Sequence, residues 1–288
     1  MGPRVAIITG ADSNYYSLLD DLLSSLRGQS YGDLFVLDMG LDEDQLDALS
    51  YRHDTAEFVS IPYKDNPQLV QSNLYKTKLP ELVSGYDVYV WVDADIWFQD
   101  VSALADLIAL SPEDMISLVP EVHPSYDFHE NYVAWREATY GAMFKPKVSD
   151  ALLKTTTLNA GLFAMRPSSP LWQAWGHLLA KLVGPGPRTT ISDQGVLNYL
   201  LHMREVQYKA LPAVNNWMTH LALPVWEPAK QALCTPDEAR TVIRAIHLAA
   251  NSKDKVFDFE LGATRLRSSF RYSDVERFFK NAISEGGG

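Results

Sequence analysis

The stretch "GYDVYVWVDADIWFQD", from Gly85 to Asp100, decides how the rest of the chain is interpreted. Its first half is rich in β-branched and aromatic residues, which is typical of a buried strand. That strand runs directly into Asp93-Ala94-Asp95, so two carboxylates stand two residues apart at its carboxyl end. In extended backbone such side chains point to the same face, roughly 6–7 Å apart. They repel each other unless a cation lies near them or one is protonated.

Strand and helix patterns alternate on both sides of this stretch. Runs typical of strands cover 4–10, 33–38, 56–62, 115–120, 157–167 and 241–249. Apolar residues at helical spacing predict helices over 14–29, 68–83, 101–110, 168–183, 192–203 and 273–283. Alternation of this kind implies βαβ units. We therefore predict an α/β fold with a mostly parallel, Rossmann-like sheet flanked by helices.

The chain shows no internal repeat and no convincing linker, so we expect residues 1–285 to form a single domain. Within it the regular pattern lapses over residues 121–149, which are rich in aromatic, histidine and charged side chains. A segment of this length exceeds an ordinary connection. We predict a functional loop or a small helical insertion there.

Composition narrows the functional class. The 288 residues carry 25 basic and 36 acidic side chains, a formal charge of −11, which argues against a nucleic-acid partner because such binding needs a basic surface. The single Cys234 excludes an internal disulfide and any multi-cysteine metal site. No apolar run is long enough to span a membrane, and the N-terminus does not have the pattern of a signal peptide. We expect a cytoplasmic protein with no integral membrane segment.

The Asp93-Ala94-Asp95 motif favours a metal site. In parallel sheets, ligands gather outside the carboxyl ends of the strands. Hard divalent ions such as Mg²⁺ and Mn²⁺ prefer oxygen ligands and bridge carboxylates to substrate phosphates. The motif therefore predicts a metal–diphosphate site, with capping of the following turn as the alternative.

Three later motifs place polar side chains beside predicted elements. Asn159 lies in "LNAGLFAMRP", Asp193 and Gln194 open the helix of "SDQGVLN", and His247 and Lys253 lie in "IHLAANSK". Each motif also has an ordinary explanation. Asn159 would form a turn, Asp193 and Gln194 would stabilise a helix N-terminus, and His247 would be structural. Together they also fit a third metal ligand and a counter-charge for phosphate.

The order of these motifs resembles the family-eight glycosyltransferases, the group that includes glycogenin and bacterial lipopolysaccharide galactosyl- and glucosyltransferases. The resemblance rests on the opening strand with Tyr15, "YKTKLPEL", "VDAD", "LNAGLFAMRP", "SDQGVLN" and "IHLAANSK", which together extend over most of the chain. It implies the GT-A, or nucleotide-diphospho-sugar transferase, fold. It also implies a retaining, metal-dependent transfer of a hexose from a UDP-sugar to an acceptor hydroxyl.

The resemblance assigns roles to particular residues. Asp93, Asp95 and His247 would bind Mn²⁺, with Mg²⁺ as the alternative ion. The residues expected to contact the UDP-sugar, besides the two aspartates, are Thr9, Asp12, Tyr15, Lys78, Ala94 and Lys253. Within that set, Tyr15 would stack on the base and Lys253 would contact the phosphates. The residues expected to face the sugar and act in catalysis are Asn159, Asp193 and Gln194. Asp193 is the candidate for a covalent nucleophile, and attack by the acceptor on the leaving-group face is the alternative.

The chain departs from the family at the end of the last motif. Ala250 stands where the family usually has a glycine, and Asp254-Lys255 follows Lys253 where the family has proline and tryptophan. A glycine lets backbone approach phosphate closely, so the details of the diphosphate contact are expected to differ.

Residues 121–149 are expected to shape the acceptor site. Four rings are candidates for stacking on a sugar or aglycone, namely Tyr126, Tyr132, Trp135 and Tyr140, and three side chains are candidates for hydrogen bonds, namely His123, His129 and Arg136. Packing of the aromatic side chains onto the body of the protein is the alternative. "PAVNNWMTH", residues 212–220, is a second acceptor-side candidate.

Other functions stay open from sequence alone. They include a GT-A enzyme of another family, either inverting or GDP-sugar-dependent, and a non-catalytic nucleotide-sugar-binding protein. A sugar nucleotidyltransferase is disfavoured because "TGADSNYY" lacks the basic, glycine-rich loop expected after the first strand. The acceptor is a saccharide, lipid-linked glycan, small molecule or protein, and the assembly is a monomer or homodimer.

Overall fold

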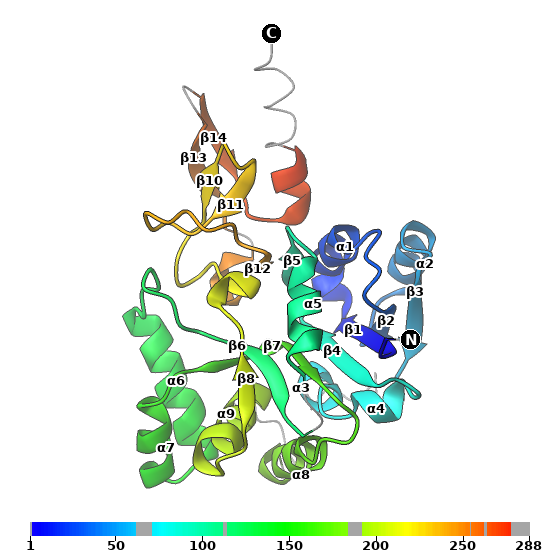
Figure 1. Cartoon of the computed structure of the whole chain (residues 1–288), viewed down its shortest axis with the longest axis vertical. Helices are drawn as coiled ribbons and strands as arrows, with labels where there is room; N and C mark the ends of the chain where they lie inside the picture. The colour runs from blue at the N-terminus through cyan, green and yellow to red at the C-terminus, as the bar shows by residue number, and fades with distance from the viewer. Residues whose placement is uncertain are drawn as a thin grey trace.

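A computed structural model describes residues 2–61, 71–111, 114–183, 192–253, 255–261 and 264–277. Over these ranges the central sheet has seven strands in the order β3-β2-β1-β4-β7-β6-β8 (Figure 1). Their bounds are β1 (Val5–Ala11), β2 (Asp33–Asp38), β3 (Ala56–Ser60), β4 (Val88–Val92), β6 (Ile116–Pro120), β7 (Leu158–Met165) and β8 (Tyr208–Ala210). Only β7 runs antiparallel to its neighbours β4 and β6, so the expectation of a mostly parallel α/β sheet is confirmed.

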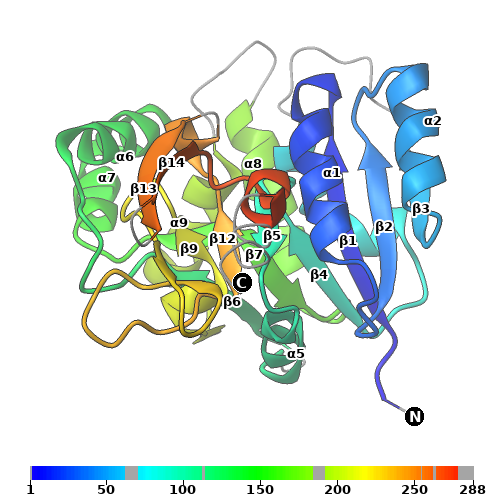
Figure 2. The same ribbon diagram turned by 90° about the horizontal axis from the view of Figure 1, so that it is seen from above.

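Helices cover both faces of the sheet. They are α1 (Tyr16–Ser25), α2 (Glu43–Arg52), α3 (Gln71–Tyr75), α4 (Leu79–Leu82), α5 (Ser102–Ala109), α6 (Glu130–Met143), α7 (Pro146–Leu153), α8 (Leu171–Val183) and α9 (Asp193–Met203), with short 3-10 turns η1 (Ser13–Tyr15), η2 (Ala213–Asn215) and η3 (Ala250–Ser252). Figures 1 and 2 show α2 at one end of the sheet and α6 with α7 at the other.

The strands are apolar on both faces because each face packs on helices. Along β1, Val5 and Ile7 join the cluster formed with α1 and α5, whereas Ala6 and Ile8 join the cluster formed with α8 and α9. The same alternation holds in β4, where Val90 faces the first cluster and Trp91 faces the second. This two-sided burial explains why β4 reads in the sequence as a continuous apolar run.

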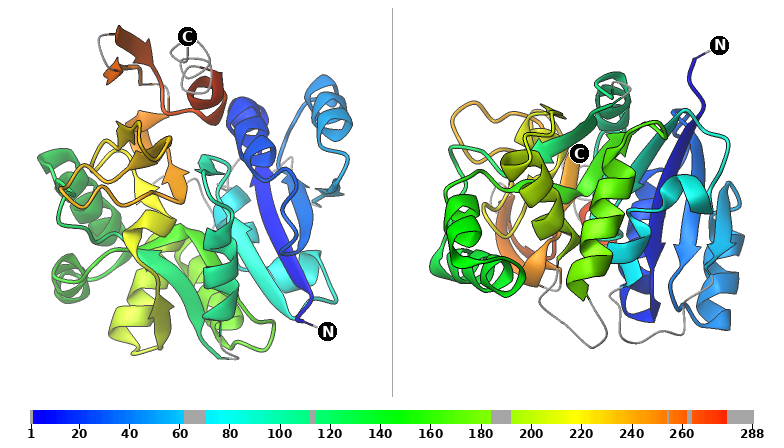
Figure 3. Two further views of the ribbon diagram at one scale, coloured as in Figure 1. Left: turned by 45° about the horizontal axis from the view of Figure 1, so that its top comes forward. Right: turned by 90° about the horizontal axis from the view of Figure 1, so that it is seen from below.

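A smaller sheet continues the chain beyond the Asp93-Ala94-Asp95 turn. Its strands, in the order β5-β12-β9, are β5 (Ile96–Phe98), β12 (Ala245–His247) and β9 (Trp217–Met218). Two hairpins extend from this part of the molecule, β10 (Val225–Glu227) with β11 (Ala232–Cys234), and β13 (Phe257–Leu261) with β14 (Thr264–Ser268). Figure 3 shows the second hairpin well away from the N-terminus.

Several predicted elements differ from the structure in extent. The strand predicted over 241–249 is reduced to β12, and residues 121–149 contain α6 and the beginning of α7. The helix predicted over 273–283 begins at Tyr272 and is described as far as Arg277. Residue 62 of the strand predicted over 56–62 and residues 68–70 of the helix predicted over 68–83 lie outside the described residues. No helix in the described ranges combines the length and the apolar character that crossing a membrane requires.

Candidate active site

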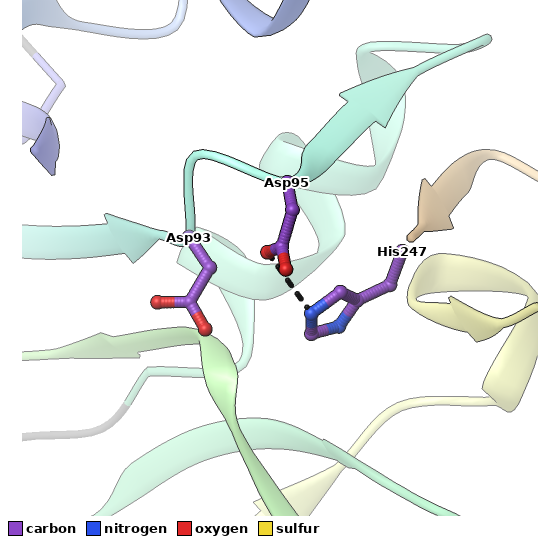
Figure 4. Close-up of side chains that lie close together, drawn as sticks. All are labelled: Asp93, Asp95 and His247. Carbon is purple, nitrogen blue, oxygen red and sulfur yellow. Dashed lines mark ion pairs between the residues drawn. The ribbon is translucent and has the colours of Figure 1, made fainter. Parts of the chain in front are cut away.

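Asp93, Asp95 and His247 converge where β4 meets the smaller sheet (Figure 4). One ligand atom from each of them lies within 4.8 Å of the others. His247 Nε2 lies 3.2 Å from Asp95 Oδ1, and both side chains are buried. Among the described residues, this is the only group of three or more such side chains with this spacing.

Strand pairing brings His247 to the aspartates across a large sequence separation. β5 begins directly after Asp95, and β12 pairs with it antiparallel so that His247 stands opposite Ile96. The Leu248 amide then donates to the Asp95 carbonyl at 2.9 Å. The position of the histidine therefore follows from backbone pairing rather than from side-chain contacts alone.

Because Gly161 has no side chain, the side chains of Asp93 and His247 can occupy the space beside it. The Asp93 amide donates to the Gly161 carbonyl at 2.7 Å, because antiparallel β7 passes beside the end of β4. A Cβ atom on Gly161 would lie 2.7 Å from Asp93 Oδ2 and 2.7 Å from His247 Cε1. Two carboxylates and one imidazole in this space fit Mn²⁺ or Mg²⁺ by their chemistry, since these ions take oxygen ligands and Mn²⁺ also accepts imidazole.

Asp95 lies between Lys253 and His247. Lys253 Nζ lies 2.9 Å from Asp95 Oδ2, while His247 approaches the other oxygen. Burial by itself would raise the pKa of Asp95, but His247 and Lys253 outweigh it and lower that pKa below its ordinary value. Lys253 also donates to the Tyr15 hydroxyl at 2.8 Å and lies 4.8 Å from the centre of the Tyr15 ring. Tyr15 thus holds a lysine whose ammonium contacts Asp95.

Lys76 is the second lysine of the site, and sequence reasoning missed it. Its Nζ lies 2.8 Å from Asp93 Oδ1 and 3.0 Å from Asp193 Oδ2, and the residue is only 5% exposed. Burial would lower the pKa of Lys76, but the two carboxylates raise it, so the ammonium stays charged. Trp91 Nε1 donates to the same Asp93 oxygen at 2.7 Å.

Lys78, the lysine predicted to contact the donor, precedes α4 at its N-cap position and is partly exposed. Within the described structure, Lys76 is the lysine of this segment that forms ion pairs with Asp93 and Asp193. The contact of Lys78 with a donor stays a prediction.

A chain of amides connects the cluster to a buried carboxyl group. His247 Nδ1 lies 3.1 Å from Asn216 Oδ1, and Asn216 donates to Asn159 Oδ1 at 3.0 Å. Asn159 in turn donates to Glu121 Oε1 at 2.9 Å. Gln194 joins this network through both atoms of its side-chain amide. Its Oε1 accepts from the Ala160 amide at 3.0 Å, and its Nε2 is 3.5 Å from Glu121 Oε1. The predicted residues Asn159 and Gln194 therefore belong to one connected network.

Glu121 is the carboxyl group at which this network ends. Its backbone follows β6, and its other oxygen accepts from the Tyr132 hydroxyl at 2.5 Å. Burial raises the pKa of Glu121, against the lowering effect of the hydrogen bonds from Tyr132 and Asn159. Asp193 opens α9 on the other side of Gln194, and its carbonyl accepts from Trp175 Nε1 at 2.9 Å.

The remaining donor-side candidates lie at or beside the carboxyl end of β1 or within the aspartate turn. Thr9 is fully buried in β1, and its hydroxyl has no hydrogen-bond partner among the described atoms. Asp12 caps η1, because its carboxylate accepts from the amides of Asn14 and Tyr15. Ala94 is buried between the two aspartates.

The acceptor-side predictions separate into two groups. The rings of Tyr126, Tyr132 and Tyr140 are buried, so for these three the packing alternative holds and they offer no free stacking surface, whereas Trp135 is 44% exposed. Arg136 donates to the carbonyls of Leu152 and Thr155, at 2.9 and 2.8 Å, and therefore braces α6 against α7.

The two histidines of the same group also have contacts of their own. His129 Nδ1 accepts from the Tyr132 amide and caps α6, while His123 Nε2 lies 3.6 Å from Asp237 Oδ2. In residues 212–220, Asn216 joins the amide chain described above.

Ala250, where the family has glycine, adopts a left-handed backbone with φ of 53°. A non-glycine residue in this conformation is strained by about 1–2 kcal/mol. The turn between His247 and Lys253 thus keeps the backbone shape that glycine favours without having the glycine. Asp254, the other departure, lies outside the described residues.

Three residues of this region were not singled out from the sequence, namely Lys76, Glu121 and Asn216, although the last two lie inside the predicted acceptor-side segments 121–149 and 212–220. Glu121 did carry a signal, since it follows an apolar strand just as Asp93 does. Asn216 stands in the polar pair of "VNNW", and Lys76 in "YKTKL" differs from Lys78 only by position.

Comparisons with known proteins show that the chain has the GT-A fold. The galactosyltransferase LgtC in complex with donor and acceptor sugar analogues matches with a TM-score of 0.55 and 16% identity, over 86% of this chain and 88% of that chain. The glycosyltransferase GlyE of Streptococcus pneumoniae matches with a TM-score of 0.54 and 14% identity, over 98% of this chain and 64% of that chain. The bifunctional glycosyltransferase WbbM matches with a TM-score of 0.55 and 13% identity, over 87% of this chain and 46% of that chain.

These likenesses establish the predicted fold class, and at such identities they establish the fold alone. No family model and no curated protein sequence matches the chain.

Proposed function

We propose that the protein is a metal-dependent, retaining glycosyltransferase that moves a hexose from a UDP-sugar to an acceptor hydroxyl. The observation that carries this proposal is the convergence of Asp93, Asp95 and His247 at the sheet edge of a GT-A fold. LgtC, which shares this fold, forms a complex with donor and acceptor sugar analogues, and this supports sugar transfer as the use of the fold.

Asp93, Asp95 and His247 would hold Mn²⁺, or Mg²⁺ as the alternative. When bound, the ion would neutralise the negative charge that develops on the diphosphate as the glycosidic bond breaks. Gly161 supports this assignment because it keeps the space beside Asp93 and His247 free of a side chain.

The two lysines have different proposed roles. Lys253 lies beside Asp95 and donates to the Tyr15 hydroxyl, and it would contact a phosphate oxygen of a nucleotide bound there. Lys76 lies deeper and keeps Asp93 and Asp193 together as paired carboxylates. A fixed cation of this kind needs no rearrangement as charge develops, which is how preorganised electrostatics accelerates a reaction.

In the proposed transfer, the bond between the anomeric carbon and the UDP oxygen breaks, and its electron pair leaves with UDP. The acceptor oxygen forms the new bond to the anomeric carbon, and its proton passes to the oxygen of the departing diphosphate. Retention follows either from a covalent intermediate on Asp193 or from attack by the acceptor on the leaving-group face. In both routes Asp193, which is buried with its Oδ2 3.0 Å from Lys76 Nζ, would face the sugar.

The test compares Asp95→Asn with the wild type. Asparagine keeps the shape of the side chain but removes the charge that a metal requires. We expect the variant to lose Mn²⁺ binding, measured by electron paramagnetic resonance, and to lose turnover of UDP-glucose and UDP-galactose. Asp47→Asn, at an exposed aspartate on α2, is the matched control and should change neither property.

Full metal-dependent turnover in a folded Asp95→Asn variant would rule out the metal assignment. The anomeric configuration of the product, measured by NMR, tests retention separately, and an inverted product would place the enzyme in another GT-A family. The predicted cytoplasmic location, the single-domain boundary and the homodimer stay predictions.

A further inference from the structure

A row of aromatic rings leads from the buried network to the surface at the beginning of α6. The Phe128 and Tyr132 ring centres are 5.2 Å apart, and those of Tyr132 and Trp135 are 6.0 Å apart. Tyr132 and Trp135, three residues apart in α6, lie on one side of the helix, and Phe128, which precedes the helix, packs against Tyr132. Tyr132 in the middle is buried, whereas Phe128 and Trp135 are 46% and 44% exposed.

We infer that this exposed pair of rings, Phe128 and Trp135, is the binding platform for the acceptor, and that the acceptor it takes is a neutral saccharide. The inference rests on the proposed function and specifies the substrate class of the same site.

Tyr132 makes the platform continuous with the catalytic residues. Its hydroxyl donates to Glu121, and Glu121 accepts from Asn159, the residue of β7 expected to face the sugar. Tyr132 is also 2.8 Å from the Thr157 hydroxyl, which ties α6 to the start of β7. A saccharide lying on the two exposed rings would therefore have one end close to the residues that face the donor sugar.

The surroundings of the platform favour a sugar over a purely apolar partner. Large exposed side chains normally mark a binding surface when they gather together. Here the exposed polar residues Asp127 and His129 stand on either side of Phe128 in the sequence, and the exposed Asn131 follows. Ligand sites that combine aromatic faces with a few polar groups suit molecules that have both CH surfaces and hydroxyl groups, and sugars have both.

Charge favours a neutral acceptor over an anionic one. Three exposed acidic side chains, Asp127, Glu130 and Glu137, lie within two residues of an exposed ring along the chain. The nearby Arg136 directs its guanidinium to two backbone carbonyls, and burial lowers the pKa of His220, whose ring lies 6.1 Å from that of Tyr132, to about 4. His220 is therefore uncharged at neutral pH, and an anionic acceptor would meet mostly negative charge.

The experiment measures saccharide binding to protein saturated with UDP and Mn²⁺. The probes are the methyl glycosides of glucose and galactose, lactose, maltose and, as an anionic comparison, methyl glucuronide, followed by saturation-transfer NMR and titration. The variants are Trp135→Ala and Phe128→Ala, both at exposed positions. Tyr51→Ala, which removes a ring that is 90% exposed on α2, is the matched control.

We expect at least one neutral saccharide to bind, with an affinity that falls tenfold or more in Trp135→Ala and Phe128→Ala and stays unchanged in Tyr51→Ala. UDP affinity should stay within twofold of wild type in all three variants. The inference would be overturned if saccharide binding survived both platform substitutions, if no saccharide bound to UDP-loaded protein, or if the glucuronide bound more tightly than the neutral glycosides.

Failure of the proposed function gives a different result. In that case the wild type would not bind UDP with Mn²⁺, while Trp135-dependent saccharide binding to the protein without nucleotide would still support the platform.

Discussion

Replacement of Lys76 by methionine should destabilise the protein strongly at neutral and alkaline pH. Methionine keeps much of the length of the lysine stem but removes the ammonium that lies between Asp93 and Asp193. Breaking a buried ion pair by removing one partner costs about 3–5 kcal/mol because the other charge is left uncompensated. We expect about 3 kcal/mol here, since the side chain of Asp93 is 25% exposed and water can solvate it in part.

The cost should shrink in acid. Burial already raises the pKa of Asp193 above its ordinary value, with Lys76 opposing that shift. Without Lys76, the folded-state pKa of this carboxyl rises further above its unfolded value. A raised carboxyl pKa costs stability above the folded-state pKa and costs nothing below the unfolded one. The free-energy difference between variant and wild type should therefore be smaller at pH 5 than at pH 8.

Urea unfolding followed by circular dichroism at pH 5, 6.5 and 8 measures this difference. Lys78→Met is the matched control, because it removes a partly exposed lysine two residues away that makes neither of these ion pairs. A Lys76→Met protein that is no less stable than Lys78→Met at pH 8, or whose loss of stability is the same at pH 5, would contradict this role of Lys76.

Three further outcomes follow from individual residues. Ala250→Gly should raise the free energy of unfolding by about 1 kcal/mol, because glycine relieves the strain of a φ of 53°, and thermal unfolding would show no gain if the strain were absent. Gly161→Ala should weaken Mn²⁺ binding by at least tenfold, since the new methyl group would lie 2.7 Å from atoms of Asp93 and His247, and unchanged binding in calorimetry would contradict that geometry. His220, with a pKa lowered from 6.5 to about 4 chiefly by burial, binds a proton more readily in the unfolded chain, so stability should fall by at most about 3 kcal/mol as pH drops from 6.5 to 4. His220→Gln should flatten that part of the stability profile, and an equally steep profile in the variant would assign the effect to other groups.

The sequence predicted those parts of the site that depend on strand order. Asp93 and Asp95 stand out because a buried strand rarely ends in two carboxylates without a reason, and His247 follows another β-branched run. Their convergence, however, needs the pairing of β12 with β5, a contact between segments about 150 residues apart, which no local pattern shows.

The position of Asn159 shows a similar limit. Its motif was visible, but the antiparallel direction of β7 was not, and that direction places the beginning of β7 beside the end of β4. Because of it, Gly161 and Asn159 reach the same edge as the aspartates.

Lys76 could not be distinguished from Lys78 by sequence. Both lie in "YKTKL", and only the way this segment packs determines which lysine is buried against Asp93 and Asp193. The tyrosines of the 126–140 region show the same limit, because burial of Tyr126, Tyr132 and Tyr140 and exposure of Trp135 depend on how α6 packs on the sheet.

Calorimetric titration of UDP into metal-free protein, with and without Mn²⁺, tests the central claim most directly. We expect tight UDP binding only when Mn²⁺ is present, accompanied by a higher melting temperature, since a ligand that binds the folded state stabilises it. Binding of GDP in place of UDP would keep the fold and contradict the donor assignment. Binding of neither nucleotide, with Mn²⁺ present, would contradict the proposal that Asp93, Asp95 and His247 form a metal–diphosphate site.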